Sequence, residues 1–287
     1  MKKKRILSGM RPTGKLHIGH YVGALENWVQ LQDKYESFHL IADYHVLTTG
    51  LNTENIYDDT IDMLIDWLAA GLDSNSSPMF RQSQIKEHTE LFLIFSMLIT
   101  SNRLERNPTV KEQARALHID QIIYGHLGYP VLQAADILLY KGDAVPVGED
   151  QVPHVEITRE INSILLSDEP EIVKAKLRKA VTDPLKIRKN DPGRPEICLV
   201  FSYHKKFNPT EAAQIEADCR SGALGCVECK LRCAEKISTF LSPIIEKRKY
   251  YENNMNEVID ILKDGEMRAK KAAEETMTEV HQKMKFG

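Results

Sequence analysis

The sequence predicts an α/β fold in which helices wrap a parallel sheet, followed by a helical region. Short apolar stretches alternate with longer amphipathic ones through the first half of the chain, which is typical of a parallel sheet covered by helices. After about Ser167 the pattern becomes helical, with Lys, Glu and Ala prominent. A chain of 287 residues is long enough for two domains, and we expect them at residues 1–168 and 169–287.

The first half of the chain contains short candidate strands and long candidate helices. The strands are apolar and lie at residues 6–7, 38–42, 79–80 and 145–147. Helical periodicity predicts helices over residues 54–70 and 88–100. Ligands of parallel sheets bind beyond the carboxyl ends of the strands. Gly9, Asp43 and Gly148 each follow a candidate strand, so we expect the functional site near them.

The second half predicts helices joined by a connector. Residues 182–195 are rich in Pro and Gly and predict the connector, whereas residues 240–247, 256–263 and 267–284 predict amphipathic helices.

Composition restricts the cellular location more than the activity. The chain begins Met-Lys-Lys-Lys-Arg like a signal peptide, but no apolar core follows. No apolar run approaches the length that crosses a bilayer. We therefore expect a cytoplasmic protein with no membrane partner. The net charge of −3 neither favours nor excludes nucleic acid, because such binding needs only a local basic surface.

The first candidate motif is Pro-Thr-Gly-Lys-Leu-His-Ile-Gly-His at residues 12–20. His17 and His20 are three residues apart at the expected first turn of a helix, which places both imidazoles on one face. A helix N-terminus is suited to phosphates, and imidazole N–H donors can follow charge that develops at a phosphorus. On spacing alone, two ordinary surface histidines explain the pattern equally well.

The second candidate motif is the apolar segment 127–140. Pro130 is well placed as a first helical residue, and from there the polar side chains of Gln133, Asp136 and Tyr140 fall on one stripe. A buried carboxylate must be paired or hydrogen-bonded. Asp136 is therefore either the partner of a nearby arginine or a buried acceptor for a ligand.

The third candidate motif follows the strand candidate at 145–147. Gly148 permits a tight turn, and Glu149, Asp150 and Gln151 then stand at the start of a helix. Considered alone, this stretch is best explained as a helix cap rich in acidic residues.

The cysteines are clustered in the second half, with none before Cys198. Cys219, Cys226 and Cys229 give C-x6-C-x2-C downstream of Cys198. Four thiolates suit tetrahedral zinc or a [4Fe–4S] cluster, and spacing alone favours zinc because structural zinc sites are commoner. Cys233 falls one helical turn after Cys229, where we expect a buried thiol.

Together and in this order, the motifs resemble those of class I aminoacyl-tRNA synthetases. Residues 17–20, His-Ile-Gly-His, match the family's HIGH element letter for letter, and residues 127–140 are similar to the tryptophan pocket of bacterial-type tryptophanyl-tRNA synthetases. The resemblance implies a Rossmann-like catalytic domain and a C-terminal helical domain that recognises the tRNA anticodon. It also implies L-tryptophan, ATP with Mg²⁺ and tRNA(Trp) as partners, a homodimer, and no DNA partner.

The resemblance also assigns roles to individual residues. It implies that phosphate charge is neutralised during catalysis by His17, His20 and Lys15. It implies that ATP is bound by Arg11, Pro12, Thr13, Gly19, His20, Gly148, Glu149 and Asp150. The indole N–H would be accepted by Asp136, in a pocket further lined by Tyr129, Gln133, Gln151 and His45. Tyrosyl enzymes have a related fold and are the nearest alternative, but Ala-Ala-Asp-Ile at residues 134–137 favours tryptophan.

A subset of the bacterial tryptophanyl enzymes has a closely similar cysteine arrangement in the helical domain, where it holds a [4Fe–4S] cluster. This resemblance favours iron–sulfur over Zn²⁺ for the ligand set Cys198, Cys219, Cys226 and Cys229.

One family element is missing. A Lys-Met-Ser-Lys-Ser loop, whose lysines grip the pyrophosphate, follows the Gly-Glu-Asp-Gln stretch in the family. Here residues 158–161 and 162–168, which flank that loop in the family, are fused. A loop absent from the determined sequence is the favoured explanation, because such loops are lid-like. A genuine deletion or replacement by residues 186–190 are the alternatives, and a deletion would favour a paralogue that binds tryptophan or RNA without aminoacylating.

Overall fold

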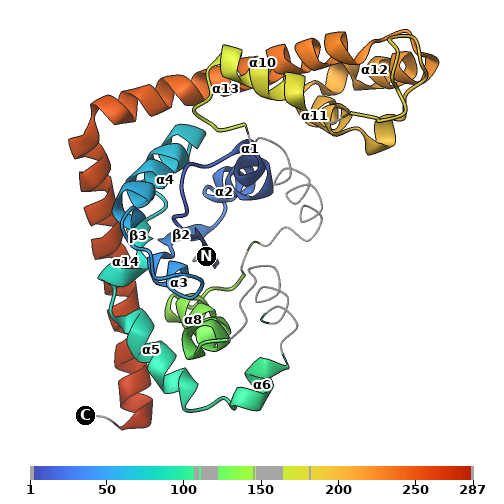
Figure 1. The fold of residues 1–287 in the computed structure, drawn as a ribbon. Helices are drawn as coiled ribbons and strands as arrows, with labels where there is room; N and C mark the ends of the chain where they lie inside the picture. Colours follow the sequence, from blue (N-terminus) through green and yellow to red (C-terminus); the bar gives the residue numbers. More distant parts are fainter. Residues whose placement is uncertain are drawn as a thin grey trace. The chain divides into compact units, whose positions relative to one another are not determined.

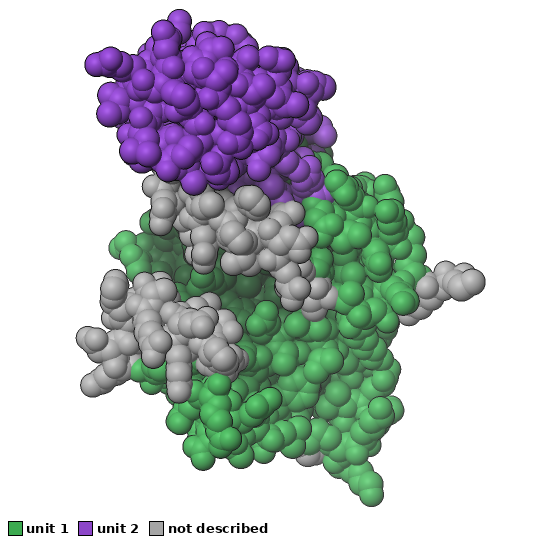
Figure 2. All heavy atoms as spheres, turned by 90° about the vertical axis from the view of Figure 1, so that its right-hand side faces the viewer, with its two compact units in different colours: residues 1–14, 27–147, 254–287 green, residues 15–26, 148–253 purple. Residues whose placement is uncertain are grey.

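The structure is a computed structural model that describes residues 3–106, 110, 122–144, 146, 164–180 and 182–285. Its contacts divide the chain into two compact units, coloured separately in Figure 2. Unit 1 comprises residues 1–14, 27–147 and 254–287, and unit 2 comprises residues 15–26 and 148–253. Neither unit is contiguous in the sequence. The expected domain boundary at 168/169 stays a prediction, since these units describe contacts and not independent folding.

Unit 1 is built on a parallel sheet with the strand order β1-β2-β3. The strands are β1 (Arg5–Met10), β2 (Glu36–Ile41) and β3 (Met79–Arg81), which confirms the apolar strands expected at 6–7, 38–42 and 79–80. The strand expected at 145–147 lies largely outside the described residues, although Ala144 forms a parallel bridge with Ile6. Gly9 allows β1 to approach β2, because a Cβ there would collide with the backbone of Leu40.

Helices of unit 1 cover the sheet (Figure 1). The described helices are α2 (Glu26–Leu31, whose first residue belongs to unit 2), α3 (Asp43–Val46), α4 (Ile56–Ala70), η2 (Gln82–Gln84), α5 (Glu87–Ser96), α6 (Ser101–Glu105), α8 (Tyr124–Leu139) and α14 (Met255–Met284). The core between helices and sheet includes Leu7, Leu40, Phe80, Leu139, Tyr140 and Met277. The helices expected at 54–70 and 88–100 are confirmed as α4 and α5, and α5 ends four residues early.

Helix α8 corrects one prediction. It begins at Tyr124, so Pro130 lies inside the helix and is not its first residue. The cause is packing: His126 and Gly128, before the proline, are buried together with Val131, after it. Burial of these residues on both sides of the proline outweighs the one backbone hydrogen bond that the proline cannot make.

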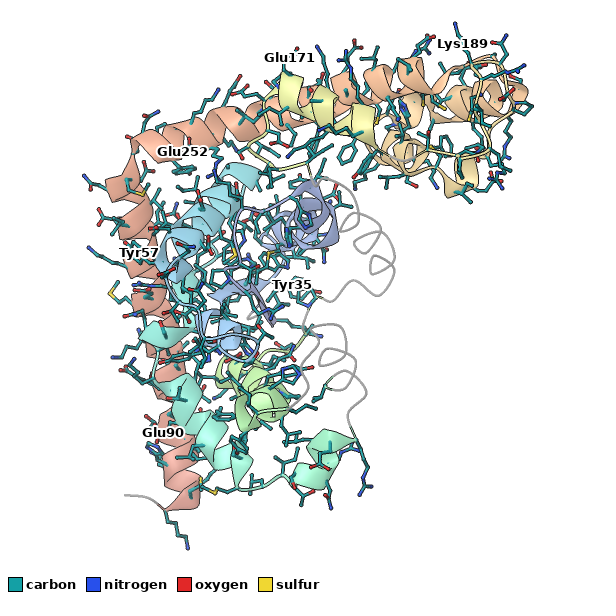
Figure 3. All side chains as sticks on the ribbon, viewed as in Figure 1. Tyr35, Tyr57, Glu90, Glu171, Lys189 and Glu252 are labelled. Carbon is teal, nitrogen blue, oxygen red and sulfur yellow. The ribbon has the colours of Figure 1, made fainter. Side chains whose placement is uncertain are left out.

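Helix α14 corrects a second prediction. The sequence predicts separate helices over 256–263 and 267–284, but residues 255–284 form one helix. Figure 1 shows it running beside α4, β3 and α5. Gly265 lies at the contact with β3, where a Cβ would collide with the backbone of Met79. The glycine therefore serves close approach to the sheet and does not end the helix. The ion pair between Glu90 of α5, labelled in Figure 3, and His281 also ties α14 to this unit.

Unit 2 is helical, as the pattern after residue 167 predicts. Its described helices are α1 (Ile18–His20), the π-helical turn η1 (Tyr21–Leu25), α10 (Pro170–Lys179), η4 (Pro195–Ile197), α11 (Leu199–Phe207), α12 (Pro209–Ser221) and α13 (Cys226–Asn253). Helix α13 packs against α10 and α11 and contains the helix expected at 240–247. Among the described residues, no helix is both long and apolar enough to span a membrane.

Candidate active site

The site in unit 1 is centred on the carboxylate of Asp136, near the end of α8. Its Oδ1 accepts hydrogen bonds from Gln82 Nε2 at 2.7 Å and His88 Nδ1 at 2.6 Å. Its Oδ2 is 2.8 Å from His45 Nε2. These donors come from η2, α5 and α3, of which α3 follows β2 and η2 follows β3. The site therefore lies beyond the carboxyl ends of the strands, where a parallel sheet places its ligands.

The carboxyl of Asp136 is buried, only 2% exposed, yet it stays ionised. Burial raises its pKa, but the hydrogen bonds from His45 and His88 outweigh burial and hold the pKa below the ordinary value. Among the described residues, the side-chain partners of Asp136 are two histidines and a glutamine, and none is the arginine of the alternative expectation.

His88 connects Asp136 to a second buried group. Its Nε2 is 2.9 Å from the hydroxyl of Tyr140, one turn after Asp136 on α8. Burial is the largest cause that raises the pKa of Tyr140 well above its ordinary value, followed by the charge of Asp136. The hydroxyl therefore keeps its proton at neutral pH.

A further carboxylate holds the site together. Asp43, at the start of α3, accepts hydrogen bonds from the backbone N–H groups of Tyr44 and Ser83 and from the Ser83 hydroxyl, the last at 2.5 Å. These bonds join the segment after β2 to the segment after β3. His45 and Gln82, adjacent to them in the chain, are thereby fixed relative to each other.

Two buried side-chain oxygens, on residues close to Asp136, have no hydrogen-bond partner among the described residues. The hydroxyl of Tyr129 and Oε1 of Gln82 are buried without a hydrogen bond among the described residues. Tyr129 precedes Asp136 by seven residues on α8, so both lie on one helix face. Burial raises the pKa of Tyr129 and the nearby charge of Arg11 partly offsets this. An unpartnered buried polar group costs about 1–3 kcal/mol, which a ligand atom could recover.

The histidine motif lies in unit 2 and is confirmed as the start of a helix. His17 is the N-cap residue of α1: its Nδ1 accepts from Gly19 N at 3.1 Å, while His20 Nδ1 accepts from His17 N at 3.2 Å. The two rings stack with centroids 3.8 Å apart. Because each Nδ1 is an acceptor, a neutral ring carries its proton on Nε2. The sequence spacing predicted the shared face but not this tautomer.

The structure describes only some of the other residues that we expect to bind ATP. Arg11 and Thr13 are exposed in unit 1, and Arg11 Nη1 is 3.5 Å from Thr49 Oγ1. Pro12 is buried in unit 1, and Lys15 is exposed in unit 2. Gly19, also in unit 2, is buried. The expected residues Gly148, Glu149, Asp150 and Gln151 lie outside the described residues. Gln133 is exposed on α8, and its place in the pocket stays a prediction.

The metal site expected at the cysteine cluster stays a prediction. Burial, followed by the charges of Cys198, Cys219 and Cys226, raises the pKa of Cys229 to about 12. Within the described part of the chain, however, no three Cys, His, Asp or Glu side chains are placed to hold a metal ion. Cys233 is buried, as predicted.

Comparisons with known proteins agree with this fold. The family of class I tRNA synthetases for W and Y matches residues 1–163 and 160–242. A tryptophan–tRNA ligase of Aquifex aeolicus is 39% identical over 98% of this chain and 99% of its own length, and one of Thermotoga maritima is 41% identical over 98% of each chain. The chain belongs to the tryptophan–tRNA ligase family.

A solved structure supports the same assignment. Tryptophanyl-tRNA synthetase of Campylobacter jejuni, complexed with ADP and tryptophan, superposes with a TM-score of 0.83 at 27% identity and covers 98% of this chain and 99% of its own. A tyrosyl-tRNA synthetase of Archaeoglobus fulgidus reaches a TM-score of 0.66 at 20% identity, which shows only a shared fold.

The alignment with one relative contains positions that this chain lacks. The alignment with the Thermotoga relative has 323 positions, so at least 36 of them have no counterpart in these 287 residues. The family match is broken at residues 160–163, where two stretches are fused in this sequence. Both findings agree with the absence of an internal segment at this point.

Sequence reasoning overlooked Gln82 and His88, although both bond to Asp136. Gln82 directly follows β3, so the rule that singled out Asp43 after β2 would have found it. His88 carries no comparable signal, because only the packing of α5 on α8 brings it to the carboxylate.

Proposed function

We propose that this chain activates L-tryptophan with ATP and transfers it to tRNA(Trp). Membership of the tryptophan–tRNA ligase family supports this activity. The observation that carries it is the buried, ionised Asp136, fixed by three donors on a sheet edge that suits a small ligand. A carboxylate there would accept the indole N–H. Phenylalanine, which lacks that donor, would be rejected, since one lone pair of the buried carboxylate would stay unpaired.

The activation step needs alignment and charge neutralisation more than proton transfer. The tryptophan carboxylate attacks the α-phosphorus of ATP, the bond to the bridging oxygen breaks, and tryptophanyl-adenylate and pyrophosphate form. The carboxylate is already a nucleophile, so no general base is required. Nε2–H of His17 and His20, with Lys15, would stabilise the negative charge that develops on the phosphates. Mg²⁺, when bound, would neutralise the leaving pyrophosphate.

Charging of tRNA tests this proposal. Purified protein should attach tryptophan to tRNA(Trp) and leave tyrosine and phenylalanine unattached. Asp136→Asn should lose tryptophan charging, with Asp143→Asn, an exposed change outside the proposed pocket, as the matched control. Charging of tyrosine by the wild-type chain would contradict the role given to Asp136 and favour a tyrosyl-type enzyme.

A second candidate function is binding of tryptophan or tRNA without activation. It is favoured by one observation, the broken family match at residues 160–163, where the lysine loop of the family would lie. A chain without these lysines would lack part of its grip on the pyrophosphate. Tryptophan binding in calorimetry without pyrophosphate exchange would support this second function. Exchange at ordinary rates would exclude it.

We also propose that Cys198, Cys219, Cys226 and Cys229 hold a [4Fe–4S] cluster, with Zn²⁺ as the alternative. Their spacing and the mutual electrostatic influence of their thiols support a shared ligand set. Iron, sulfide and zinc analysis of anaerobically purified protein tests this. Equal amounts of iron and sulfide support the cluster, zinc supports the alternative, and neither metal contradicts both. Cys226→Ser should abolish loading, whereas Cys233→Ser should not.

A homodimer is proposed on the family resemblance, and a groove in unit 1 supports it. The groove, about 640 Å³, includes the apolar residues Phe95, Leu98, Ile99, Leu104, Val131 and Leu138. Leu98 is largely exposed, so a second copy of the chain could cover this face. Light scattering should give a dimer for the wild type and a monomer for Leu98→Asp. A monomeric wild type would contradict the proposal.

Because the reaction uses tRNA and ATP, we place the protein in the cytoplasm.

A further inference from the structure

We propose that His88 is a positioning residue for indole recognition. It fixes the Asp136 carboxylate so that Oδ2 alone remains open to the indole N–H, and the Tyr140 hydroxyl orients the ring of His88. The inference rests on the proposed function and goes beyond it, because neither His88 nor Tyr140 belongs to the residues expected to contact tryptophan.

The hydrogen bonds at the carboxylate determine where a ligand can bind. A carboxylate offers four lone-pair positions, two on each oxygen. Oδ1 accepts from both Gln82 and His88, so its positions are filled. Oδ2 accepts only from His45 among the described residues, which leaves one position. An indole N–H must therefore approach Oδ2, on the oxygen that His88 does not touch.

Both partners of the His88 ring favour the same tautomer. The Asp136 carboxylate can only accept, so Nδ1, which lies 2.6 Å from Oδ1, carries a proton and donates it. In a neutral ring Nε2 then offers its lone pair, and the protonated Tyr140 hydroxyl, 2.9 Å away, donates to it. In the other tautomer, the Nδ1 lone pair would face the carboxylate and repel it. The hydrogen bond from Tyr140 to Nε2 thus orients the His88 ring for its hydrogen bond to Asp136.

The surroundings of His88 prevent it from adjusting. Its side chain is 0% exposed, and its ring lies 5.5 Å from that of Tyr140 and 6.3 Å from that of Phe80, measured between centroids. A fully buried ring with a hydrogen bond at each nitrogen keeps one orientation and transmits that orientation to the carboxylate. Loss of the Nδ1 donor would leave Oδ1 with Gln82 alone, so a lone-pair position on Oδ1 would also be open and Oδ2 would no longer be the one place for the indole N–H.

Two substitutions separate the nitrogens of His88. The amide nitrogen of His88→Asn falls close to the position of Nδ1 and keeps a donor to Asp136. The amide of His88→Gln reaches the position of Nε2, keeps a partner for Tyr140 and loses the donor to Asp136. Tyr140→Phe removes only the hydroxyl that donates to Nε2. Folding of each variant is checked by circular dichroism.

The measurement is the dissociation constant of the full chain for tryptophan and for 3-benzothienylalanine, which has sulfur in place of the indole N–H. The ratio of the two constants reports recognition of the N–H itself. The wild type should prefer tryptophan by about 10- to 100-fold, the range of a charge-assisted hydrogen bond. The preference should fall below about fivefold in His88→Gln, stay near the wild-type value in His88→Asn, and be intermediate in Tyr140→Phe.

A merely structural role for His88 predicts a different result. Both ligands would then weaken together in His88→Gln, and the ratio would stay at the wild-type value, which overturns the inference while the proposed function stands. An equal loss of preference in His88→Asn and His88→Gln also overturns it. A wild type that binds both ligands equally would overturn the proposed role of Asp136 and the inference with it.

Discussion

His39 should make the protein sensitive to acid. This residue on β2 is fully buried, with its ring stacked 4.9 Å from that of Trp28, and neither ring nitrogen has a hydrogen-bond partner among the described residues. Burial lowers its pKa from 6.5 to about 3. Below pH 6.5 the unfolded chain therefore binds a proton that the folded chain refuses, so the free energy of unfolding falls as the pH falls.

The size of the effect follows from the shift. Each pH unit between 6.5 and 3 costs about 1.4 kcal/mol, which gives a loss of about 2.7 kcal/mol at pH 4.5 from this residue. His39→Phe keeps an aromatic ring and removes the titration. Urea unfolding of both proteins at pH 7.0, 5.5 and 4.5 measures the difference in free energy of unfolding, and titrations common to both cancel. Between pH 7.0 and 4.5, the wild type should lose about 2.7 kcal/mol more free energy of unfolding than the variant does. A pH-independent difference would refute the reasoning.

Other substitutions test the site and the fold. Asp136→Asn should weaken tryptophan binding by about 10- to 100-fold in calorimetry, because a charge-assisted hydrogen bond is lost, and unchanged affinity would contradict the role of this carboxylate. His20→Asn keeps the Nδ1 acceptor and loses the Nε2 donor. It should slow pyrophosphate exchange by about 10²–10³-fold without changing the tryptophan dissociation constant, and a change in binding alone would argue against a role in catalysis. Gly265→Ala should lower the free energy of unfolding by about 1–3 kcal/mol in urea titrations, because the added Cβ collides with β3. Gly125→Ala, with open space around it in α8, is the control and should be neutral or stabilising by up to about 1 kcal/mol. Equal effects at both glycines would refute the close-approach argument.

The sequence predicted those parts of the fold and site that depend on local patterns. Apolar runs located the strands, and the polar stripe of α8 singled out Asp136. What it missed depends on contacts between distant segments. Gly265 interrupts an amphipathic pattern, so only its contact with β3 shows why α14 continues through it. His88 lies 48 residues before Asp136 in sequence, and nothing local to it shows that α5 packs on α8 there.

The expected metal site illustrates a different limit. Cysteine spacing predicts which side chains can share a cation, but it does not predict how the folded chain places the four thiols relative to one another. Similarly, letter-for-letter agreement at residues 17–20 predicts the histidine pair, whereas its tautomer follows only from the backbone N–H groups that each Nδ1 accepts.

Exchange of pyrophosphate into ATP, measured on the anaerobically purified protein with each of the amino acids in turn, shows whether the chain activates tryptophan. We predict exchange with tryptophan and with no other amino acid, which would imply that the protein has the lysine loop or a working substitute for it. Exchange with tyrosine would contradict the specificity assigned to Asp136. Absence of exchange from folded protein that still binds tryptophan would contradict catalysis and leave a tryptophan-binding member of the family.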